Sequence, residues 1–365
     1  MNKKVTFVLN VRYPTEKAYG VTTGLTAKAI NEIGTYRVEV ITPRKDISYE
    51  GYVKTVEVAM PFKKFYDYIL EMNNGLGPHA FNVWKIFYPF RLKSKLQRSD
   101  NLIWLRDIYM ALMLSLLGYQ TVCEIHRTPS LVNRVLLNIL KLRSKNTIVL
   151  ISKNLQEKLR ISKKNSVIAP MAVDQSEILT KKQKLLGNKV TIGYVGSLHS
   201  SGIKLSLQSI IDAALIFEKI KPSIRFRLVG INKNDFKKVS FPNNIQFMGR
   251  IPRSESIKAI DNFDIGLVIY PDEKYFIDSF PIKIVEYAAR CVPIIASNTT
   301  SHRNILGNKK AIFFDLNSAE SLAKSIIYLL SDSIKRESIT TESNHWVKQF
   351  TYQKRIEGVL RKTKF

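Results

Sequence analysis

Apolar runs of strand length alternate with longer segments in which apolar residues recur at helical spacing. This pattern predicts β-strands and α-helices in turn. In the first half the expected strands are Lys4–Val11, Arg37–Thr42, Leu102–Trp104, Thr121–Ile125, Thr147–Ile151 and Ser166–Ile168. The expected helices there are Thr23–Ile33, Ile108–Leu117, Ser130–Leu142 and Asn154–Arg160.

The second half repeats the alternation. Its expected strands are Val190–Val195, Arg225–Val229, Ile245–Met248, Ile265–Ile269 and Pro293–Ala296. Helices are expected at Leu205–Ile220, at Ser254–Asp261, from Pro281 onward, and at Ala319–Leu330. Strands that alternate with helices and short breaks predict parallel sheets covered on both faces.

The alternation is interrupted once, which predicts two domains. A polar, lysine-rich segment at 174–188 has no apolar period and is expected to be a linker. We therefore predict an α/β fold with two Rossmann-like, doubly wound domains, 1–173 and 189–344, which face each other across a cleft. The segment 345–365 is helical in pattern and aromatic, and is expected to pack back on the first domain.

One segment combines a helix start with two acids. It reads Asp278-Ser-Phe-Pro-Ile-Lys-Ile-Val-Glu286 and is followed by an apolar strand. Ser279 can cap a helix and Pro281 suits its first turn, which puts Lys283 and Glu286 one turn apart on one face. Backbone N–H groups at such a start bind phosphate, and a carboxylate one turn in can accept hydrogen bonds from a ribose diol. An ordinary amphipathic helix with solvated charges fits the same residues equally well.

Composition and charge limit the partners. The 365 residues carry a net charge of +27, with 27 basic and 13 acidic residues in 1–175 and 30 against 17 in the rest. A diffuse excess of basic residues favours a folded protein that binds nucleic acid, an anionic membrane leaflet or phosphorylated substrates. Solubility or a lysine-rich background composition would explain part of it.

Membrane spans and disulfides are not expected. No stretch reaches the ~18 apolar residues of a membrane span. The first apolar run is too short for a signal peptide and predicts a buried strand. Cys123 and Cys291 lie in apolar runs, which favours free thiols in a reducing cytoplasm.

The second half resembles the C-terminal domain of family 4 glycosyltransferases, which have the GT-B fold. The matching blocks are Ile192–Leu198, Phe226–Gly230, Ile245–Arg250, Asp264–Pro271, the acid pair Asp278 and Glu286, and Pro293–Ser297. The first half resembles the family more loosely, in the blocks Trp104–Asp107, Cys123–His126, Val149–Ser152 and Val167–Asp174.

The resemblance implies a retaining, metal-independent hexosyltransferase that moves a sugar from a nucleotide diphosphate, UDP or GDP, to an alcohol. It implies catalytic roles for His126, Asp278 and Glu286, with Glu286 on the ribose and no metal or other cofactor. Lys204, Arg250 and Lys283 are the candidate cations for the diphosphate. The implied donor site is completed by Gly20 and Gly24, expected in the loop after the first strand, and by Gly196, Ser197, Pro281 and Ile282. A histidine at the end of an apolar strand is also common as a plain core or surface residue.

Several residues depart from the family pattern. Ser197 and Ser201 occupy positions where the family usually places an arginine and a lysine that hold the diphosphate. Losing such a cation typically costs ~3 kcal/mol of barrier. We therefore expect Lys204 or Lys283 to substitute, or a slow enzyme, or a non-catalytic glycosyltransferase-like subunit. Asp278 stands where a glutamate is more usual, and Cys291 where a glycine is common.

The segment 61–98 is the least family-like and is expected to face the acceptor. It interleaves aromatic residues with seven basic and two acidic ones. Such a composition suits an anionic lipid surface. We therefore expect a peripheral enzyme on the cytoplasmic face of the membrane, acting on a lipid-linked glycan in cell-surface polysaccharide or glycolipid assembly. A helical insertion with a solvated basic face is the alternative. A basic nucleic-acid-binding protein is a further, less favoured alternative function, and no nucleic-acid partner is expected, because nothing here resembles a nucleic-acid motif and the basic charge is diffuse.

Overall fold

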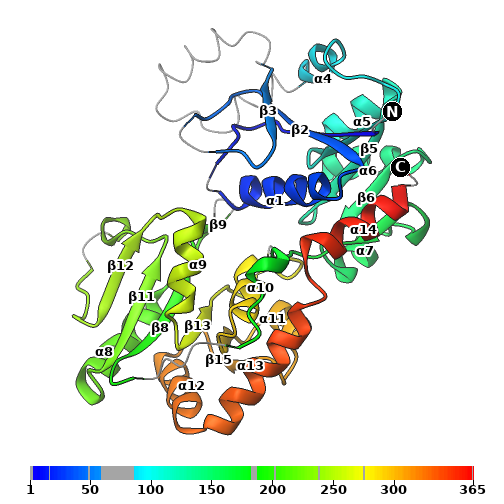
Figure 1. The fold of residues 1–365 in the computed structure, drawn as a ribbon. Coiled ribbons are helices and arrows are strands. Elements are labelled where there is room, and N and C mark those ends of the chain that lie inside the picture. Colours follow the sequence, from blue (N-terminus) through cyan, green and yellow to red (C-terminus); the bar gives the residue numbers. More distant parts are fainter. Residues whose placement is uncertain are drawn as a thin grey trace. The chain divides into compact units, whose positions relative to one another are not determined.

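The chain forms two compact units. The computed structural model describes residues 3–15, 17–47, 50–58, 86–181, 187–200, 203–236, 239–273, 276–363 and 365 (Figure 1). Unit 1 comprises Met1–Pro170 together with Tyr352–Phe365, and unit 2 comprises Met171–Thr351. The chain thus leaves unit 1 once and returns to it at its C-terminal end.

Unit 1 is built on a parallel sheet with the strand order β3-β2-β1-β4-β5-β6-β7. Each pair of neighbouring strands in this order runs parallel. The order reverses between β1 and β4, so this is a doubly wound sheet whose carboxyl edge is the expected ligand edge. Its strands are β1 Lys3–Val8, β2 Tyr36–Thr42, β3 Lys54–Glu57, β4 Asn101–Leu105, β5 Gln120–Ile125, β6 Thr147–Leu150 and β7 Ser166–Ile168.

Helices cover both faces of this sheet. The chain crosses from β1 to β2 in one direction along the sheet, and from β4 to β5 and β6 in the other. Because such crossovers are right-handed, α1 lies on one face and α5 and α6 lie on the other. The last helix, α14, packs against α1, β6 and β7 and therefore lies on the face of α1. The helices are α1 Ala18–Glu32, α4 Tyr88–Leu92, α5 Ile108–Leu116, α6 Leu131–Lys141, α7 Lys153–Lys158, a 3-10 turn Lys163–Asn165, and α14 Tyr352–Thr363.

Unit 2 repeats the plan with the strand order β12-β11-β8-β13-β14-β15, again parallel throughout. Its strands are β8 Val190–Val195, β11 Ile224–Val229, β12 Ile245–Gly249, β13 Ile265–Val268, β14 Ile294–Ser297 and β15 Ile312–Phe314, with a small hairpin of β9 His199–Ser200 and β10 Ile203–Lys204. Its helices are α8 Gln208–Ile220, α9 Arg253–Asp261, α10 Ile282–Ala289, α11 Thr300–Leu306, α12 Ala319–Ser331 and α13 Ser333–Val347, with 3-10 turns Gln175–Glu177 and Lys233–Asp235.

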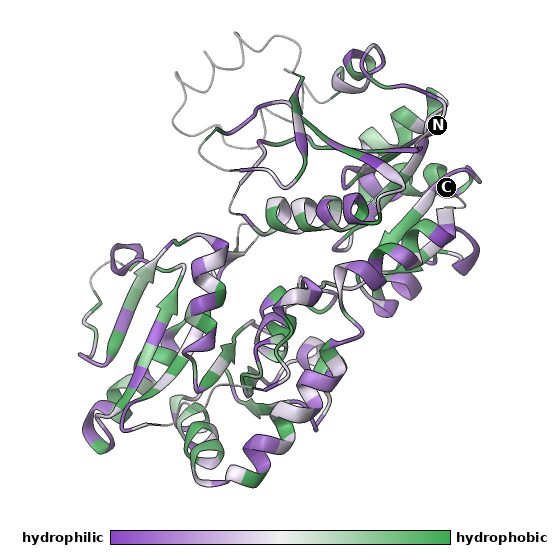
Figure 2. Ribbon diagram, viewed as in Figure 1, coloured by the Kyte–Doolittle hydropathy of each residue, from purple (hydrophilic) through white to green (hydrophobic). Residues whose placement is uncertain are grey.

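The unit 2 sheet carries a hydrophobic core on each face. On one face α8 and α12 pack together, and Phe217 and Phe226 are fully buried there. On the other face α10 packs against α13, around Phe263 and Tyr287. Hydrophobic and hydrophilic residues alternate along the covering helices, as expected for elements that bury one face on a sheet (Figure 2).

The two-sheet α/β fold confirms the fold class, but the element bounds differ in places. The strands β3 and β15 and the helices α11 and α13 were not predicted. Helix α13 has a mostly polar sequence and is held by a few buried residues such as Ile339 and Val347. Helix α1 begins at Ala18, five residues before its predicted start at Thr23.

The unit boundaries also differ from the predicted ones. The expected helical segment 345–365 is broken, because α13 ends at Val347 and α14 begins at Tyr352. Residues before 182 in the predicted linker 174–188 are part of unit 2, where Asp174 caps a 3-10 turn and the Leu179 amide donates to the Ala289 carbonyl. The polar composition of this segment predicted a linker, because its contacts are made with residues distant in the sequence.

Both cysteines are buried free thiols, as predicted. Within the described parts of the chain, no helix has the combination of length and hydropathy that a bilayer crossing requires. Most of the predicted acceptor segment 61–98 lies outside the described residues, and only its end, from residue 86, is described.

Substitution of Gly193 tests the packing inside unit 2. A Cβ there would lie within 2.1–2.2 Å of the Phe263 ring, so Gly193→Ala overpacks the core. Such overpacking typically costs about 1–3 kcal/mol. We expect a lower unfolding temperature by calorimetry, whereas Gly187→Ala, with nothing within 4 Å of its added Cβ, leaves it unchanged. Equal unfolding temperatures for the two variants would contradict this packing.

Candidate functional site

Glycines bring two loops of unit 2 into contact at the carboxyl edge of its sheet. Gly196 follows β8 with a φ of +155°, and Gly230 follows β11 with a φ of +87°. A Cβ on Gly230 would lie 2.5 Å from the Gly196 carbonyl oxygen. Only glycine fits this approach, which leaves backbone rather than side chains at the edge where parallel sheets bind ligands.

A buried lysine lies against the first of these loops. Lys283, in the first turn of α10, is 4% exposed. A Cβ on Gly196 would lie only 2.8 Å from its Nζ, so the ammonium group borders the Gly196 backbone. Nζ is 4.0 Å from the centre of the Tyr194 ring and 5.1 Å from that of Tyr270. It is buried with no hydrogen-bond partner among the described residues.

Burial controls the charge of this lysine. It lowers the pKa of Lys283 to about 7, with Glu286 opposing the shift. His302 is buried within the electrostatic influence of Lys283. Its pKa is lowered to about 4, mainly by burial and in part by the Lys283 charge. His302 Nδ1 lies 2.8 Å from the Ser297 carbonyl oxygen. An orphaned ammonium beside a neutral histidine is an environment that an anion would stabilise.

Glu286 takes part in an ion-pair network that the sequence did not reveal. One carboxylate oxygen pairs with Arg253 at the start of α9. Arg253 also donates to both oxygens of Glu177, at 3.0 and 2.8 Å. Glu286 is 6% exposed, and it lies one helical turn from Lys283, as predicted. Arg253 is 33 residues from its partner, so no local pattern signals the pair.

The start of α10 differs in detail from its prediction. Ser279 does not cap the helix, because its hydroxyl donates to the Phe276 carbonyl at 2.7 Å. Pro281 is the N-cap residue and Ile282 the first helical residue, so the first-turn amides lack a side-chain cap. Asp278 lies just before this start and is 2% exposed.

The other two candidate cations lie at the surface. Lys204 is exposed on β10, across from His199 in the hairpin, and Arg250 is exposed after β12. Ser197 turns its hydroxyl toward the hairpin, where it accepts from the His199 amide at 3.0 Å. Ser201 lies outside the described residues. Of the three predicted cations, Lys283 alone is buried beside Gly196.

In unit 1, His126 belongs to a buried cluster centred on Glu124. Glu124 is the penultimate residue of β5 and is 3% exposed. It accepts hydrogen bonds from Arg106 Nε at 3.1 Å and from Trp104 Nε1 at 3.4 Å. Its other oxygen pairs with Arg355 of α14, whose Nε donates to the Pro170 carbonyl at 3.0 Å. One carboxylate thus joins β4, β5 and the terminal helix.

The cluster keeps His126 neutral. Its Nε2 is buried and lies 3.1 Å from Glu124 Oε1, outside hydrogen-bond geometry, while 27% of the side chain is exposed. Burial lowers the pKa of His126 well below its usual value, and the Arg106 charge lowers it further. The imidazole follows the carboxyl end of β5, so it stands at the ligand edge of the unit 1 sheet. Arg106 and Arg355, whose pKa values burial lowers to about 10 and about 9, both remain charged at neutral pH.

The predicted loop position of Gly20 and Gly24 is wrong. Both lie inside helix α1. A Cβ on Gly20 would lie 2.3 Å from Thr15 Cγ2, and one on Gly24 would lie 2.5 Å from the Tyr52 ring. These glycines allow neighbouring chain to pack on the helix, a tertiary requirement that spacing alone does not distinguish from a phosphate loop.

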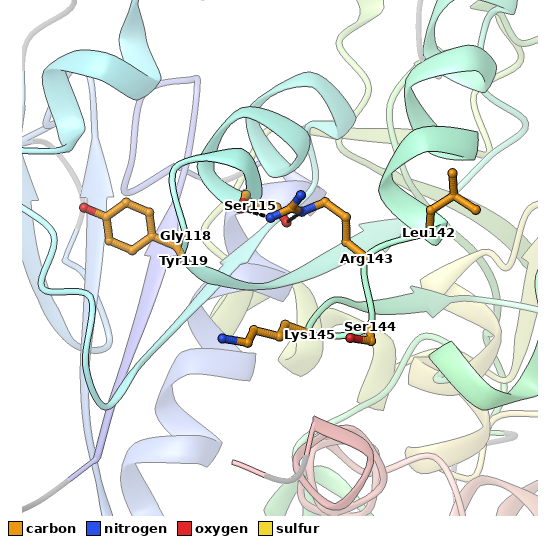
Figure 3. Close-up of a pocket in the computed structure, with 7 residues that line it drawn as sticks. All are labelled: Ser115, Gly118, Tyr119, Leu142, Arg143, Ser144 and Lys145. Carbon is orange, nitrogen blue, oxygen red and sulfur yellow. Dashed lines mark hydrogen bonds between the residues drawn. The ribbon is translucent and has the colours of Figure 1, made fainter.

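A pocket of about 330 Å³ lies elsewhere in unit 1 (Figure 3). It is lined by Ser115, Gly118, Tyr119 and residues 142–145. Arg143 reaches across it, and its guanidinium donates to the Ser115 hydroxyl at 2.7 Å and to the Ser115 carbonyl at 2.8 Å. These residues precede β5 and β6, so the pocket is at the amino edge of the sheet, opposite His126. No group of three His, Cys, Asp or Glu side chains within the described ranges is placed to hold a metal ion.

Comparisons with known proteins show a family match in unit 2 and a fold match over both units. Residues 175–346, which contain most of unit 2, match the family model described as "Glycosyl transferases group 1". No curated protein matches the sequence.

Solved structures match both units. A glycosyltransferase from Rickettsia africae is 16% identical with a TM-score of 0.70, over 100% of this chain and 98% of that one. TarM from S. aureus, solved with UDP, is 9% identical with a TM-score of 0.71 over 100% of both chains. Anabaena HepE, solved with UDP and glucose, is 13% identical with a TM-score of 0.68, over 98% of this chain and 99% of that one. The chain therefore has the GT-B fold of these glycosyltransferases, and its second unit matches the group 1 glycosyltransferase family.

Proposed function

We propose that the protein is a retaining glycosyltransferase that moves a hexose from a nucleotide diphosphate to a hydroxyl of a lipid-linked glycan. The family match of unit 2 supports glycosyl transfer, and the UDP bound in TarM and HepE supports UDP as the donor nucleotide. GDP is the alternative base.

The buried Lys283 ammonium is the observation that carries this proposal. It lies beside the glycine backbone of the β8 loop and in the first turn of α10, where helix amides favour negative charge. A diphosphate here would supply the partner that this ammonium lacks. In this proposal Lys283 replaces the cations that are absent at Ser197 and Ser201.

The reaction follows from where charge develops. The bond between the anomeric carbon and the diphosphate oxygen breaks, and the acceptor oxygen forms a bond on the same face of the sugar. The acceptor proton passes to the leaving diphosphate. The growing negative charge on that group is met by Lys283 and the α10 amides, which are already oriented before the reaction. We propose that no divalent metal takes part, and turnover in the presence of a chelator tests this.

The acids would act on the sugar parts of the donor. We propose that Glu286 accepts hydrogen bonds from the ribose hydroxyls and that its ion pair with Arg253 fixes the carboxylate. Asp278, next to the same helix start, would face the donor sugar. His126 would contact the transferred sugar as a neutral imidazole.

The acceptor side is proposed from charge and surface. The described end of the 61–98 segment exposes Phe87 and Phe90, 49% and 51% accessible, next to basic residues. Such a surface supports an acceptor at an anionic membrane, and we propose a peripheral position on its cytoplasmic face in cell-surface glycan assembly.

Donor binding tests the role of Lys283 directly. Isothermal calorimetry with UDP- and GDP-sugars should show binding of one donor, and Lys283→Met should weaken it by about 10- to 100-fold, because one charge-assisted contact is lost. The same variant should unfold at a higher temperature, since burial disfavours the ammonium form of Lys283 and an apolar side chain avoids that cost.

Lys204→Met is the matched control, because it removes an exposed lysine from the same unit and should leave affinity nearly unchanged. Equal loss in both variants would contradict the assignment. No binding of any nucleotide by the unmodified protein would favour a non-catalytic subunit.

Donor affinity should also depend on pH. The pKa of Lys283 in the free protein is about 7, so at lower pH the ammonium is already present and affinity is flat. Above pH 7 the diphosphate must bind together with a proton, and affinity should fall by up to about tenfold per pH unit. Calorimetry in two buffers of different ionisation enthalpy should detect the proton uptake. A dependence that persists in Lys283→Met would assign it to another group.

Substitution of His126 separates chemistry from nucleotide binding. Since His126 belongs to unit 1 and the proposed nucleotide contacts to unit 2, His126→Ala should lower turnover by about 100-fold or more while nucleotide affinity stays unchanged. Released nucleotide, measured with a membrane lipid extract as acceptor source, reports turnover. Unchanged turnover would make His126 a structural residue of the Glu124 cluster.

A further inference from the structure

Helix α6 of unit 1 presents an apolar stripe to solvent. Five large apolar side chains point outward from it and from its C-cap residue: Leu131, Val132, Val135, Ile139 and Leu142, which are 79%, 71%, 60%, 43% and 84% exposed. At 100° per residue they fall within one sector of about 100°, so they form a single stripe along the helix. We call these five residues the α6 stripe.

The stripe is not a by-product of core packing. Leu137 and Leu140 are the buried residues of α6, and they lie on the side of the helix opposite the stripe. Helix α6 packs on α5 through that inner side. The helix therefore has a complete inner face and a second apolar face, and contiguous apolar surface of this kind marks an interaction site.

The charge around the stripe indicates its partner. From residue 125 to residue 156 the chain has no acidic residue, whereas it has six basic ones: Arg127, Arg134, Lys141, Arg143, Lys145 and Lys153. Arg134 borders the stripe on one side of the helix, and Arg127 and Lys145 are exposed in the segments before and after the helix. The charged groups of Lys141 and Arg143 instead donate to the Leu159 carbonyl and to Ser115. An apolar face with basic margins is the pattern of a helix that lies in the interface of an anionic bilayer.

A second copy of the chain fits this surface less well. Pairing two stripes would bring their basic margins together, in a protein whose net charge is already +27. Anionic lipid headgroups instead neutralise these margins while acyl chains accept the apolar side chains. Phe87 and Phe90, at the start of α4, are also exposed, and α4 packs against α5 as α6 does.

The geometry points to the α6 stripe and its basic margins as a docking surface for an anionic membrane leaflet. This inference rests on the proposed function for its biological sense, because a lipid-linked acceptor must be reached at a membrane. It places the docking surface on α6, a helix that the sequence pattern indicated only as an ordinary element of the sheet.

Vesicle flotation of the full chain tests the surface. The unmodified protein should float with vesicles of phosphatidylcholine and phosphatidylglycerol and bind pure phosphatidylcholine weakly. Changing Leu131, Val135 and Leu142 together to Ser should reduce binding at least about tenfold, since each apolar side chain contributes to burial in the leaflet. Arg134→Gln with Lys145→Gln should weaken binding to anionic vesicles only, as should high salt.

The matched control changes three exposed apolar residues of unit 2, Leu215, Ile220 and Ile334, to Ser. It should bind as the unmodified protein does, and all variants should keep their unfolding temperature, because the changed side chains are exposed. Equal binding by the stripe variant, an equal loss in the control, or no vesicle binding at all would overturn the inference. The inference would also be overturned if light scattering showed a dimer of the unmodified protein and a monomer of the stripe variant alone, because a second copy would then cover the stripe.

Calorimetry with a UDP-sugar on the same proteins separates the two proposals. The stripe variant should keep the donor affinity of the unmodified protein. Donor binding without vesicle binding would remove the docking surface and leave the proposed function intact. Vesicle binding without any nucleotide binding would contradict the proposed function and leave the docking surface supported.

Discussion

The candidate site depends on a buried amine, that of Lys283, whose nitrogen has no hydrogen-bond partner in the described part of the chain. Lys283 extends between two tyrosine rings and against the backbone of Gly196. Glu286, the acid whose charge acts on it, is already paired with Arg253. Burying an ammonium group this way opposes folding, as its lowered pKa reflects. The hydrophobic cores on both faces of the unit 2 sheet hold the strand, loop and helix that surround it.

The cluster around Glu124 in unit 1 contains a buried charge of the opposite sign, and this charge is paired. There a buried carboxylate is surrounded by donors from β4, from the residue after it and from the terminal helix. Because these contacts satisfy the carboxylate, the neighbouring His126 is not required to carry a compensating charge. The return of α14 to unit 1 therefore affects the state of a candidate site residue as well as the stability of the sheet.

The two units thus provide different chemistry at equivalent edges. Unit 2 offers a buried ammonium group beside closely packed glycine backbone, which suits a diphosphate. Unit 1 offers a neutral imidazole beside a buried carboxylate that pairs with Arg106 and Arg355, which suits contact with an uncharged sugar. Unit 1 also carries the basic, apolar surface of α6. In the proposed function, unit 2 binds most of the donor and unit 1 forms the acceptor side.

The sequence by itself determined the alternating α/β plan, because strand and helix periodicity are local properties of the chain. It also located α10 and put Lys283 and Glu286 on one face, since helical spacing is fixed by residue number. Only the tertiary structure decided which lysine is buried, because Lys204 and Lys283 look alike in sequence and differ in what packs around them. It likewise decided that Gly20 and Gly24 lie inside a helix, that Arg253 pairs with Glu286, and that Arg355 reaches Glu124 across 231 residues. These facts depend on contacts between distant segments, and no local pattern encodes which segments will meet.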